Sequence, residues 1–148
     1  MNVGIVGLGV IGRAVSRALD KGIPGLKLAG ATARDREKAE RFLKALRSPA
    51  PFFSLEALIE VSDIVVEAST QAHLQEVAPR TLKAGKDLVV LSCGGLLGRQ
   101  DWVDLAATNR CRIFIPSGAI AGLDGVKGAC VGAITSVTME TRKPPRGL

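Results

Sequence analysis

Three glycines near the N-terminus have the spacing that points most directly to chemistry. Gly7, Gly9 and Gly12 follow a short apolar segment in the pattern G-x-G-x-x-G, and a helical pattern begins at Val10. In a strand–turn–helix unit these glycines permit, in order, a tight turn, the approach of a pyrophosphate, and close packing of helix on strand. The helix N-terminus then attracts the phosphate charge. We predict a dinucleotide-binding turn, with an ordinary strand–helix turn as the alternative; its residues are Gly7, Leu8, Gly9, Val10, Ile11 and Gly12.

The end of the second predicted strand indicates which dinucleotide is bound. NAD-binding units of this kind usually carry Asp or Glu about 20 residues beyond the glycines, where the carboxylate binds the ribose 2′-hydroxyl. Here Ala33 occupies that place and Arg34 follows it, while Asp35 is explained as a helix cap. Because Arg34 is able to pair with a 2′-phosphate that no carboxylate repels, we predict that the cofactors are NADP and, beside it, NAD.

Small polar residues after the later strands are further candidates, because ligands of such sheets bind at the carboxyl ends of the strands. The segment 92–94 is one candidate on this ground. The alternative is that these residues only suit turns. We predict cofactor contacts from the following five residues: Ser69, Thr70, Ser117, Gly118 and Ala119.

Two residues with reactive side chains are given structural roles. His73, the only histidine, is predicted to lie at the surface near the start of a helix, with contact to the cofactor edge as the alternative. Cys93 is predicted to be a small buried residue, because nothing near it in sequence would activate its thiol. No group of His, Cys and Asp has the spacing of metal ligands, so we predict no metal.

Composition excludes several classes of protein. The 148 residues, 47% hydrophobic, suit one domain with a sizeable core. The net charge is +6, but the basic residues are interleaved with acids and aromatic residues make up only 3%, which argues against nucleic acid. Three cysteines without paired spacing, no signal peptide and no apolar run of about 20 residues argue against secretion and membranes. We expect a cytoplasmic protein without nucleic-acid or membrane partners.

Apolar segments alternate with helical patterns along the first 116 residues. This order predicts an α/β fold class, with a doubly wound parallel sheet of the Rossmann NAD(P)-binding type. We expect Pro79 to kink or shorten its helix, and the inner face of the first helix to hold Ile11, Ala14, Val15 and Ala18. The strands are expected at 2–6, 26–32, 52–53, 63–68, 87–92 and 112–115.

The last part of the chain has a different pattern. A Gly-rich loop is followed by a short helix predicted at 123–131 and by an alternating segment at 135–142 that is typical of a half-buried strand. This strand has no evident partner in the sheet described above. We therefore predict a Rossmann domain at 1–116 and, at 117–148, the loop, helix and first strand of a truncated α+β catalytic domain.

Several stretches resemble the L-aspartate dehydrogenase family. They are residues 7–12, 63–68 and 115–124 and the ending 137–145. The Pro-Ser-Gly-Ala-Ile loop and the Thr-Arg-Lys-Pro-Pro ending are the specific part, and the likeness covers the chain but only about the first half of a typical member. It implies that Ala119 touches the cofactor, that the catalytic His lies beyond residue 148, and that the protein is a homo-oligomer.

The resemblance also implies a reaction. Family members oxidise L-aspartate with NAD or NADP, giving iminoaspartate or, after hydrolysis, oxaloacetate and ammonia, and some of them serve NAD biosynthesis. Because the expected His is absent, we expect this chain to be inactive alone. Two alternatives stay open: an NAD(P)-binding module without catalysis, and another amino-acid-pathway reductase that resembles homoserine dehydrogenase.

Overall fold

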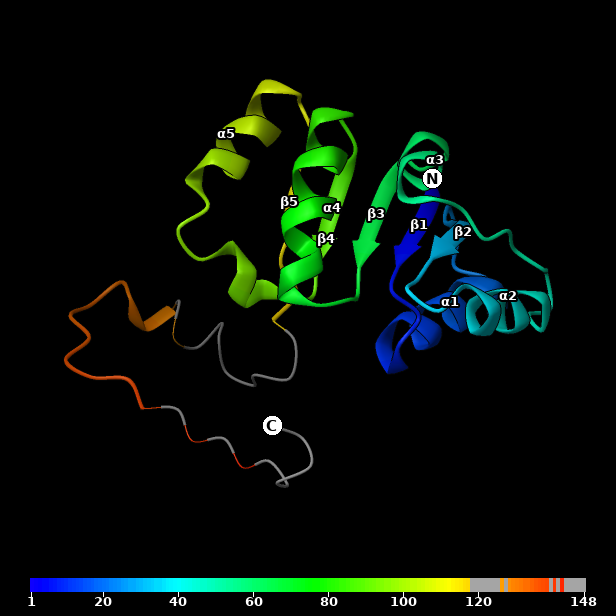
Figure 1. The fold of residues 1–148 in the computed structure, drawn as a ribbon. Helices are drawn as coiled ribbons and strands as arrows, with labels where there is room; N and C mark the ends of the chain where they lie inside the picture. Colours follow the sequence, from blue (N-terminus) through cyan, green and yellow to red (C-terminus); the bar gives the residue numbers. More distant parts are fainter. Residues whose placement is uncertain (118–125, 127, 139, 141, 143–148) are drawn as a thin grey trace. The chain divides into compact units, whose positions relative to one another are not determined.

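A parallel sheet of five short strands organises the computed structural model (Figure 1). The structure describes residues 1–117, 126, 128–138, 140 and 142. The spatial order of the strands is β2-β1-β3-β4-β5, and all neighbouring pairs are parallel. The predicted fold class is therefore confirmed. The strands are β1 (Asn2–Val6), β2 (Lys27–Thr32), β3 (Ile64–Glu67), β4 (Asp87–Val90) and β5 (Ile113–Phe114).

Three of the helices between the strands begin at residues whose side chains cap them. Asp35, Ser54 and Thr70 each accept a backbone N–H from the first turn of the helix that follows. The helices are α1 (Val10–Lys21), α2 (Arg36–Lys44), α3 (Leu55–Val61), α4 (Gln71–Lys83) and α5 (Gln100–Thr108), with a short 3-10 helix, η1 (Cys93–Leu96). Within the described residues, no helix is long and apolar enough to cross a membrane.

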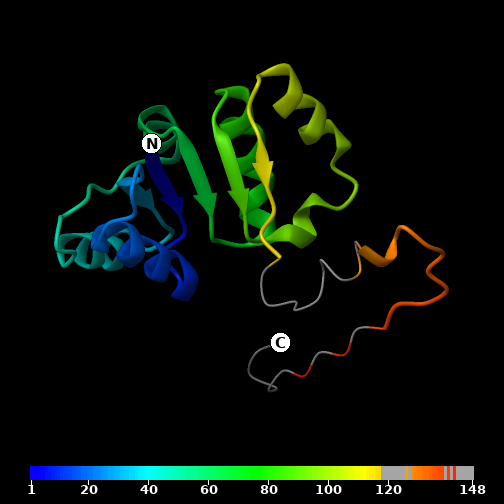
Figure 2. The same cartoon turned by 180° about the vertical axis from the view of Figure 1, so that it is seen from behind.

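Two apolar clusters hold the helices on the sheet. Successive residues of a strand point to opposite faces, so Ile5 packs with the residues of α1 and α2, and Val6 packs with those of α3, α4 and α5. Figure 2 shows the sheet from the side opposite to that of Figure 1, with α4 and α5 behind it. Because all neighbouring strands are parallel, their carboxyl ends lie at one common edge of the sheet.

The first helix buries a different face from the predicted one. Gly12, Ser16 and Leu19 are buried, whereas Ile11 is 57% exposed and Ala14 and Ala18 are exposed too. Of the four predicted residues, only Val15 packs against the core, where it is half-buried. The glycine decides this rotation, because a Cβ on Gly12 would lie 1.9 Å from the carbonyl oxygen of Gly7. The Ser16 hydroxyl donates to the carbonyl of Gly12 at 2.8 Å, so burying it leaves no unpaired group.

Two further expectations are corrected by the structure. Residues 52 and 53 do not form a strand; Phe52 makes a single bridge to Ala31 on β2, and the neighbouring Pro51 has no N–H to extend a ladder. Of the two effects expected of Pro79, shortening does not occur, because α4 runs from Gln71 to Lys83 with Pro79 inside it, while the kink stays a prediction. The packing of Leu74 and Val77 in the core stabilises the continuous helix and offsets the backbone hydrogen bond that Pro79 cannot donate.

Residues 117–148 form a second compact unit, separate from the unit 1–116. Of the helix expected at 123–131, residues 126, 128 and 129 are helical, and most of the others lie outside the described residues. The strand expected at 135–142 is not formed at 135–138, 140 or 142. A strand requires a neighbouring backbone to pair with, and no described residue pairs with this segment.

Candidate functional site

A cleft of about 670 Å³ lies at the carboxyl ends of β1, β2 and β3. It is lined by the turn after β1, by the end of β2 with the start of α2, and by the end of β3 with the start of α4. The lining residues are Gly7, Leu8, Gly9, Arg13, Thr32, Ala33, Arg34, Asp35, Lys38, Ala39, Ala68, Ser69, Thr70 and His73. The cleft therefore lies at the edge where doubly wound sheets bind their ligands.

The three glycines of the first turn have three different surroundings. Gly7 has φ +95°, and a Cβ there would lie 2.5 Å from the carbonyl oxygen of Ala68. Gly12 packs against Gly7 as described above. Gly9 has an extended backbone, with φ −73° and ψ −160°, and a Cβ on it would meet no protein atom within 4 Å. Protein packing therefore explains Gly7 and Gly12, whereas the space beside Gly9 is open to a ligand.

The N-terminus of α1 faces this open space. No side chain caps α1, in contrast to α2, α3 and α4. The first amides of a helix have no partner within it, so a bound phosphate is able to accept from them. Arg13 closes the turn from the other side, because its Nε donates to the carbonyl of Leu8 at 2.9 Å.

Cationic side chains surround the end of β2. Arg13, Arg34 and Lys38 all line the cleft, and none of them forms an ion pair within the described part of the chain. Asp35 is the one carboxylate among the lining residues, and its Oδ1 accepts the backbone N–H of Lys38 at 3.0 Å as the cap of α2. Ala33 lies partly buried at the end of β2, where a ribose-binding acid was expected. The balance of charge at this end is suited to an anion.

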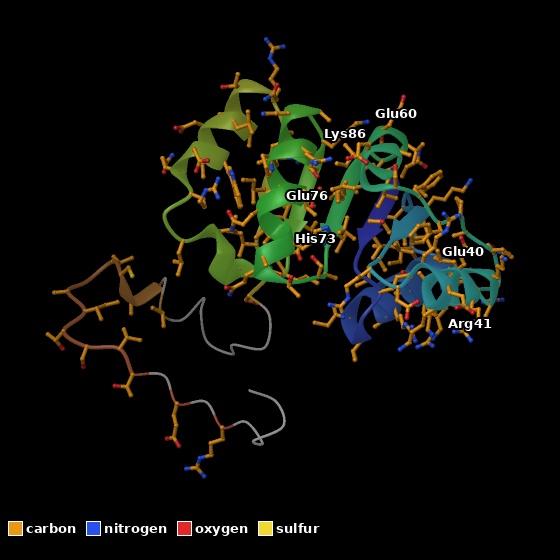
Figure 3. All side chains as sticks on the ribbon, viewed as in Figure 1. Glu40, Arg41, Glu60, His73, Glu76 and Lys86 are labelled. Atoms are coloured by element: carbon orange, nitrogen blue, oxygen red, sulfur yellow. The ribbon has the colours of Figure 1, made fainter. Side chains whose placement is uncertain are left out.

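The end of β3 places a hydroxyl and an imidazole side by side. The Oγ of Ser69 lies 3.2 Å from Nδ1 of His73 and donates to the buried carboxylate of Glu67 at 2.7 Å. Thr70 accepts the backbone N–H of His73 at 3.3 Å and thereby caps α4. Figure 3 shows His73 at the first turns of α4, with Glu60 and Lys86 at the opposite end of the sheet. His73 therefore belongs to the cleft and is only half-buried.

The structure brings together half of the residues predicted to bind cofactor. Gly7, Leu8, Gly9, Arg34, Ser69 and Thr70 line the cleft. The side chains of Val10 and Ile11 point to solvent beside it, and Gly12 lies beneath the turn. Ser117 is exposed and belongs to the second unit, while Gly118 and Ala119 lie outside the described residues. The roles of all these residues remain predictions.

Sequence reasoning missed Arg13 and Lys38 as cleft residues. Both belong to the basic residues that are interleaved with acids along the sequence. Their positions gave a usable signal, since Arg13 directly follows the third glycine and Lys38 is four residues beyond Arg34, about one helical turn. Cys93 is half-buried, and its thiol donates to the carbonyl of Val90 at 3.3 Å. No group of His, Cys, Asp and Glu that would hold a metal occurs among the described residues.

Comparison with known proteins agrees with this geometry. Residues 7–116 match the family described as "Homoserine dehydrogenase, NAD binding domain". The chain belongs to this family. The match begins at the first glycine of the turn and ends at Pro116, where the first compact unit also ends. The matched residues therefore include every residue that lines the cleft.

Several curated relatives of this chain are named L-aspartate dehydrogenase. One from Bradyrhizobium diazoefficiens is 45% identical over 148 residues, which is 100% of this chain and 52% of the relative. Another from Methanothermobacter thermautotrophicus is 42% identical over 151 residues, 100% of this chain and 58% of the relative. The predicted resemblance is confirmed. The chain spans about half the length of the curated relatives it matches.

A solved structure shows the same fold. A probable dehydrogenase from Thermotoga maritima superposes with a TM-score of 0.69 at 19% identity, over 88% of this chain and 41% of the other. This likeness concerns the Rossmann architecture, and it agrees with the strand order and the flanking helices described above.

Proposed function

We propose that this chain is the cofactor-binding part of an NAD(P)-dependent L-aspartate dehydrogenase. The observation that supports cofactor binding most directly is the open space beside Gly9, which no protein atom fills and which faces the uncapped N-terminus of α1. The relatives named L-aspartate dehydrogenase, which match the chain over its whole length, support the choice of substrate. The proposed reaction is oxidation of L-aspartate at its α-carbon.

Different regions of the chain bind different parts of the cofactor. The turn of Gly7, Leu8 and Gly9 and the first amides of α1 hold the pyrophosphate. Arg34 and Lys38 hold the phosphorylated adenosine ribose at the end of β2. When bound, the nicotinamide accepts a hydride from the substrate. The loops after β3 and β4 orient that half of the cofactor, and the segment 117–119 completes the contact.

NADP is the preferred cofactor in this proposal. The end of β2 offers Ala33 in place of a carboxylate, so a 2′-phosphate meets no repulsion from that position. Asp35 accepts a hydrogen bond within its own helix, which reduces its availability to a ribose hydroxyl. Arg34 and Lys38 are exposed at the rim and have no partner in the described residues. NAD binds more weakly because it lacks the group that these cations attract.

A second candidate is a reductase that acts on another amino-acid-pathway substrate, and the family description that names homoserine dehydrogenase favours it. The full-length matches to L-aspartate dehydrogenases favour aspartate. A substrate panel on the protein isolated from its source separates the two. L-aspartate should reduce NADP and L-homoserine should not; the reverse result would replace our proposal.

Cofactor binding is tested with Gly9→Ala. The alanine Cβ meets no protein atom, and the backbone of residue 9 is extended, so the free energy of unfolding should change by less than about 0.5 kcal/mol. A bound pyrophosphate would collide with the new methyl group, so the Kd for NADPH should rise at least about tenfold. Calorimetry on the 148-residue chain measures the affinity, and thermal unfolding measures the stability.

Gly12→Ala is the matched control, because it adds the same methyl group where the protein itself leaves no room. With the carbonyl of Gly7 at 1.9 Å from the added atom, we expect a loss of about 1–3 kcal/mol in stability. If Gly9→Ala binds NADPH as well as the wild type does, the open space beside Gly9 is not the pyrophosphate site.

A further inference from the structure

A buried carboxylate lies directly beneath the cleft. Glu67 is the last residue of β3 and is 0% exposed, although it has no ion pair within the described part of the chain. Burying a carboxylate is costly unless hydrogen bonds replace its hydration. A carboxylate that is buried despite this cost usually has a role that an apolar side chain could not fill.

The hydrogen bonds of Glu67 come from two loops. Its Oε1 accepts the backbone N–H and the hydroxyl of Ser69, both at 2.7 Å. The same oxygen accepts the hydroxyl of Ser92 at 3.1 Å, and Oε2 accepts the backbone N–H of Ser92 at 3.1 Å. Ser69 follows β3 by two residues, and Ser92 follows β4 by two residues. One carboxylate therefore ties together the loops at the carboxyl ends of two neighbouring strands.

All four groups around Glu67 are donors. A carboxylate only accepts, so it satisfies all of them, whereas the amide of glutamine would direct an N–H toward one. The chain of contacts continues into the cleft. Because the single hydrogen of the Ser69 hydroxyl is donated to Glu67, that oxygen is left to accept from Nδ1 of His73. The carboxylate thus positions a backbone loop and, through it, an imidazole.

We infer that Glu67 is a positioning residue for the nicotinamide half of the cofactor. The adenosine half lies over the end of β2 and the pyrophosphate over the glycine turn, so the remaining half runs toward β3 and β4, where Ser69 and Ser92 lie. This inference rests on the proposed function. Glu67 itself is not a lining residue of the cleft and touches no ligand; it acts through the two serine loops.

The test compares whole cofactors with fragments that lack nicotinamide. Calorimetry on the 148-residue chain measures the Kd of each ligand. The Kd for NADPH is compared with that for 2′,5′-ADP, and the Kd for NADH with that for ADP-ribose. In Glu67→Gln, one N–H of the new amide faces a donor of Ser92 or Ser69, so the loops lose their common anchor. We expect the Kd for NADPH to rise about tenfold, while the Kd for 2′,5′-ADP stays within about twofold.

Two further variants separate positioning from stability. Leu88→Val removes one methylene from the core at the amino end of β4 and should lower stability without changing the ratio of the two affinities. Ser92→Ala removes one hydroxyl donor and should raise the Kd for NADPH about threefold. When it is combined with Glu67→Gln, that Kd should rise no further than in Glu67→Gln alone. If Glu67→Gln does not fold, the affinities of Ser92→Ala for NADPH and for 2′,5′-ADP test the positioning role alone.

Each outcome has one meaning. A wild-type chain that binds neither cofactor nor fragment overturns the proposed function itself. If the wild type binds both, the proposed function stands. The positioning role is then overturned if Glu67→Gln leaves both affinities unchanged, or if it weakens the binding of cofactor and fragment equally. Selective loss of the nicotinamide-bearing ligands supports the inference.

Discussion

Two arginines that are separated only by Asp35 differ in their surroundings, and the difference bears on cofactor choice. Arg34 lines the cleft without an ion pair in the described residues, whereas Arg36 pairs with Glu40 at 2.7 Å and lies over the ring of Phe52. Their equal charges should therefore have unequal effects on a bound 2′-phosphate.

We expect Arg34→Ala to raise the Kd for NADPH about tenfold and to leave the Kd for NADH within about twofold. Arg36→Ala removes the same charge from the chain and should leave both values within about twofold. The measurement is calorimetry with each cofactor at one fixed ionic strength, since the attraction is screened by salt. An unchanged preference for NADPH in Arg34→Ala would remove Arg34 from the proposed site.

Single residues of the site were predictable where their chemistry is local. The glycine spacing, the missing acid at Ala33 and the helix cap Asp35 are read from neighbouring positions. The hydrogen bonds between Glu67 and Ser92 were not predictable, because residues 25 positions apart in the sequence give no indication that two strand ends lie together. A contact of that kind depends on the strand order, which pattern alone does not supply.

Among the elements, the edge strand β5 is joined to β4 by a side-chain contact as well as by backbone pairing. It has only two residues, and Asp87 at the start of β4 accepts from the backbone N–H and the guanidinium of Arg112 just before it. The hydrogen bonds from Arg112 lower the pKa of Asp87 below its ordinary value. The contact therefore favours the ionised carboxylate in the folded protein.

Asp87→Asn should lower the free energy of unfolding by about 1 kcal/mol at pH 7. Because the folded-state pKa is the lower one, this contribution is present above the unfolded-state pKa and is lost as the pH falls through the folded-state value. The difference between wild type and variant should thus be constant above about pH 5 and shrink below about pH 4. Urea unfolding at several pH values measures it.

The same substitution at Asp104, an exposed residue of α5, provides the control and should change stability by less than about 0.5 kcal/mol. A difference between Asp87→Asn and wild type that persists at pH 3 would show that the carboxylate charge is not its source.

Elements were predicted better than the faces they bury. The apolar segments of the sequence located all five strands of the sheet to within about two residues at each end. The buried face of α1 was wrong because apolar periodicity assigns a glycine and a serine to the outside. Close packing of backbone on backbone at Gly12 decided the rotation, and such packing leaves no apolar signal in the sequence.

At the scale of the whole molecule, the core belongs to the first unit alone. Every buried apolar residue that the structure describes lies between Val3 and Cys111. The proposed boundary after Pro116 therefore separates a part with a core from a part whose described residues contribute nothing to that core.

A chain that ends at Pro116 should unfold cooperatively with a free energy within about 0.5 kcal/mol of that of the full chain. If the segment 117–119 contacts the nicotinamide as proposed, the shortened chain should bind 2′,5′-ADP normally and NADPH several-fold more weakly. Chemical unfolding and calorimetry measure the two effects. A shortened chain that does not fold would show that residues 117–148 are part of the first domain.

Trp102 and His73 are the only tryptophan and the only histidine, and the chain has no tyrosine. Trp102 is 1% exposed in the core beneath α5, whereas the imidazole of His73 lies at the wall of the cleft. Intrinsic fluorescence therefore reports the integrity of the core, and a single set of imidazole resonances in a proton NMR spectrum reports the state of the cleft. The molecule contains two separate natural probes, so unfolding and ligand occupancy are followed independently without any label.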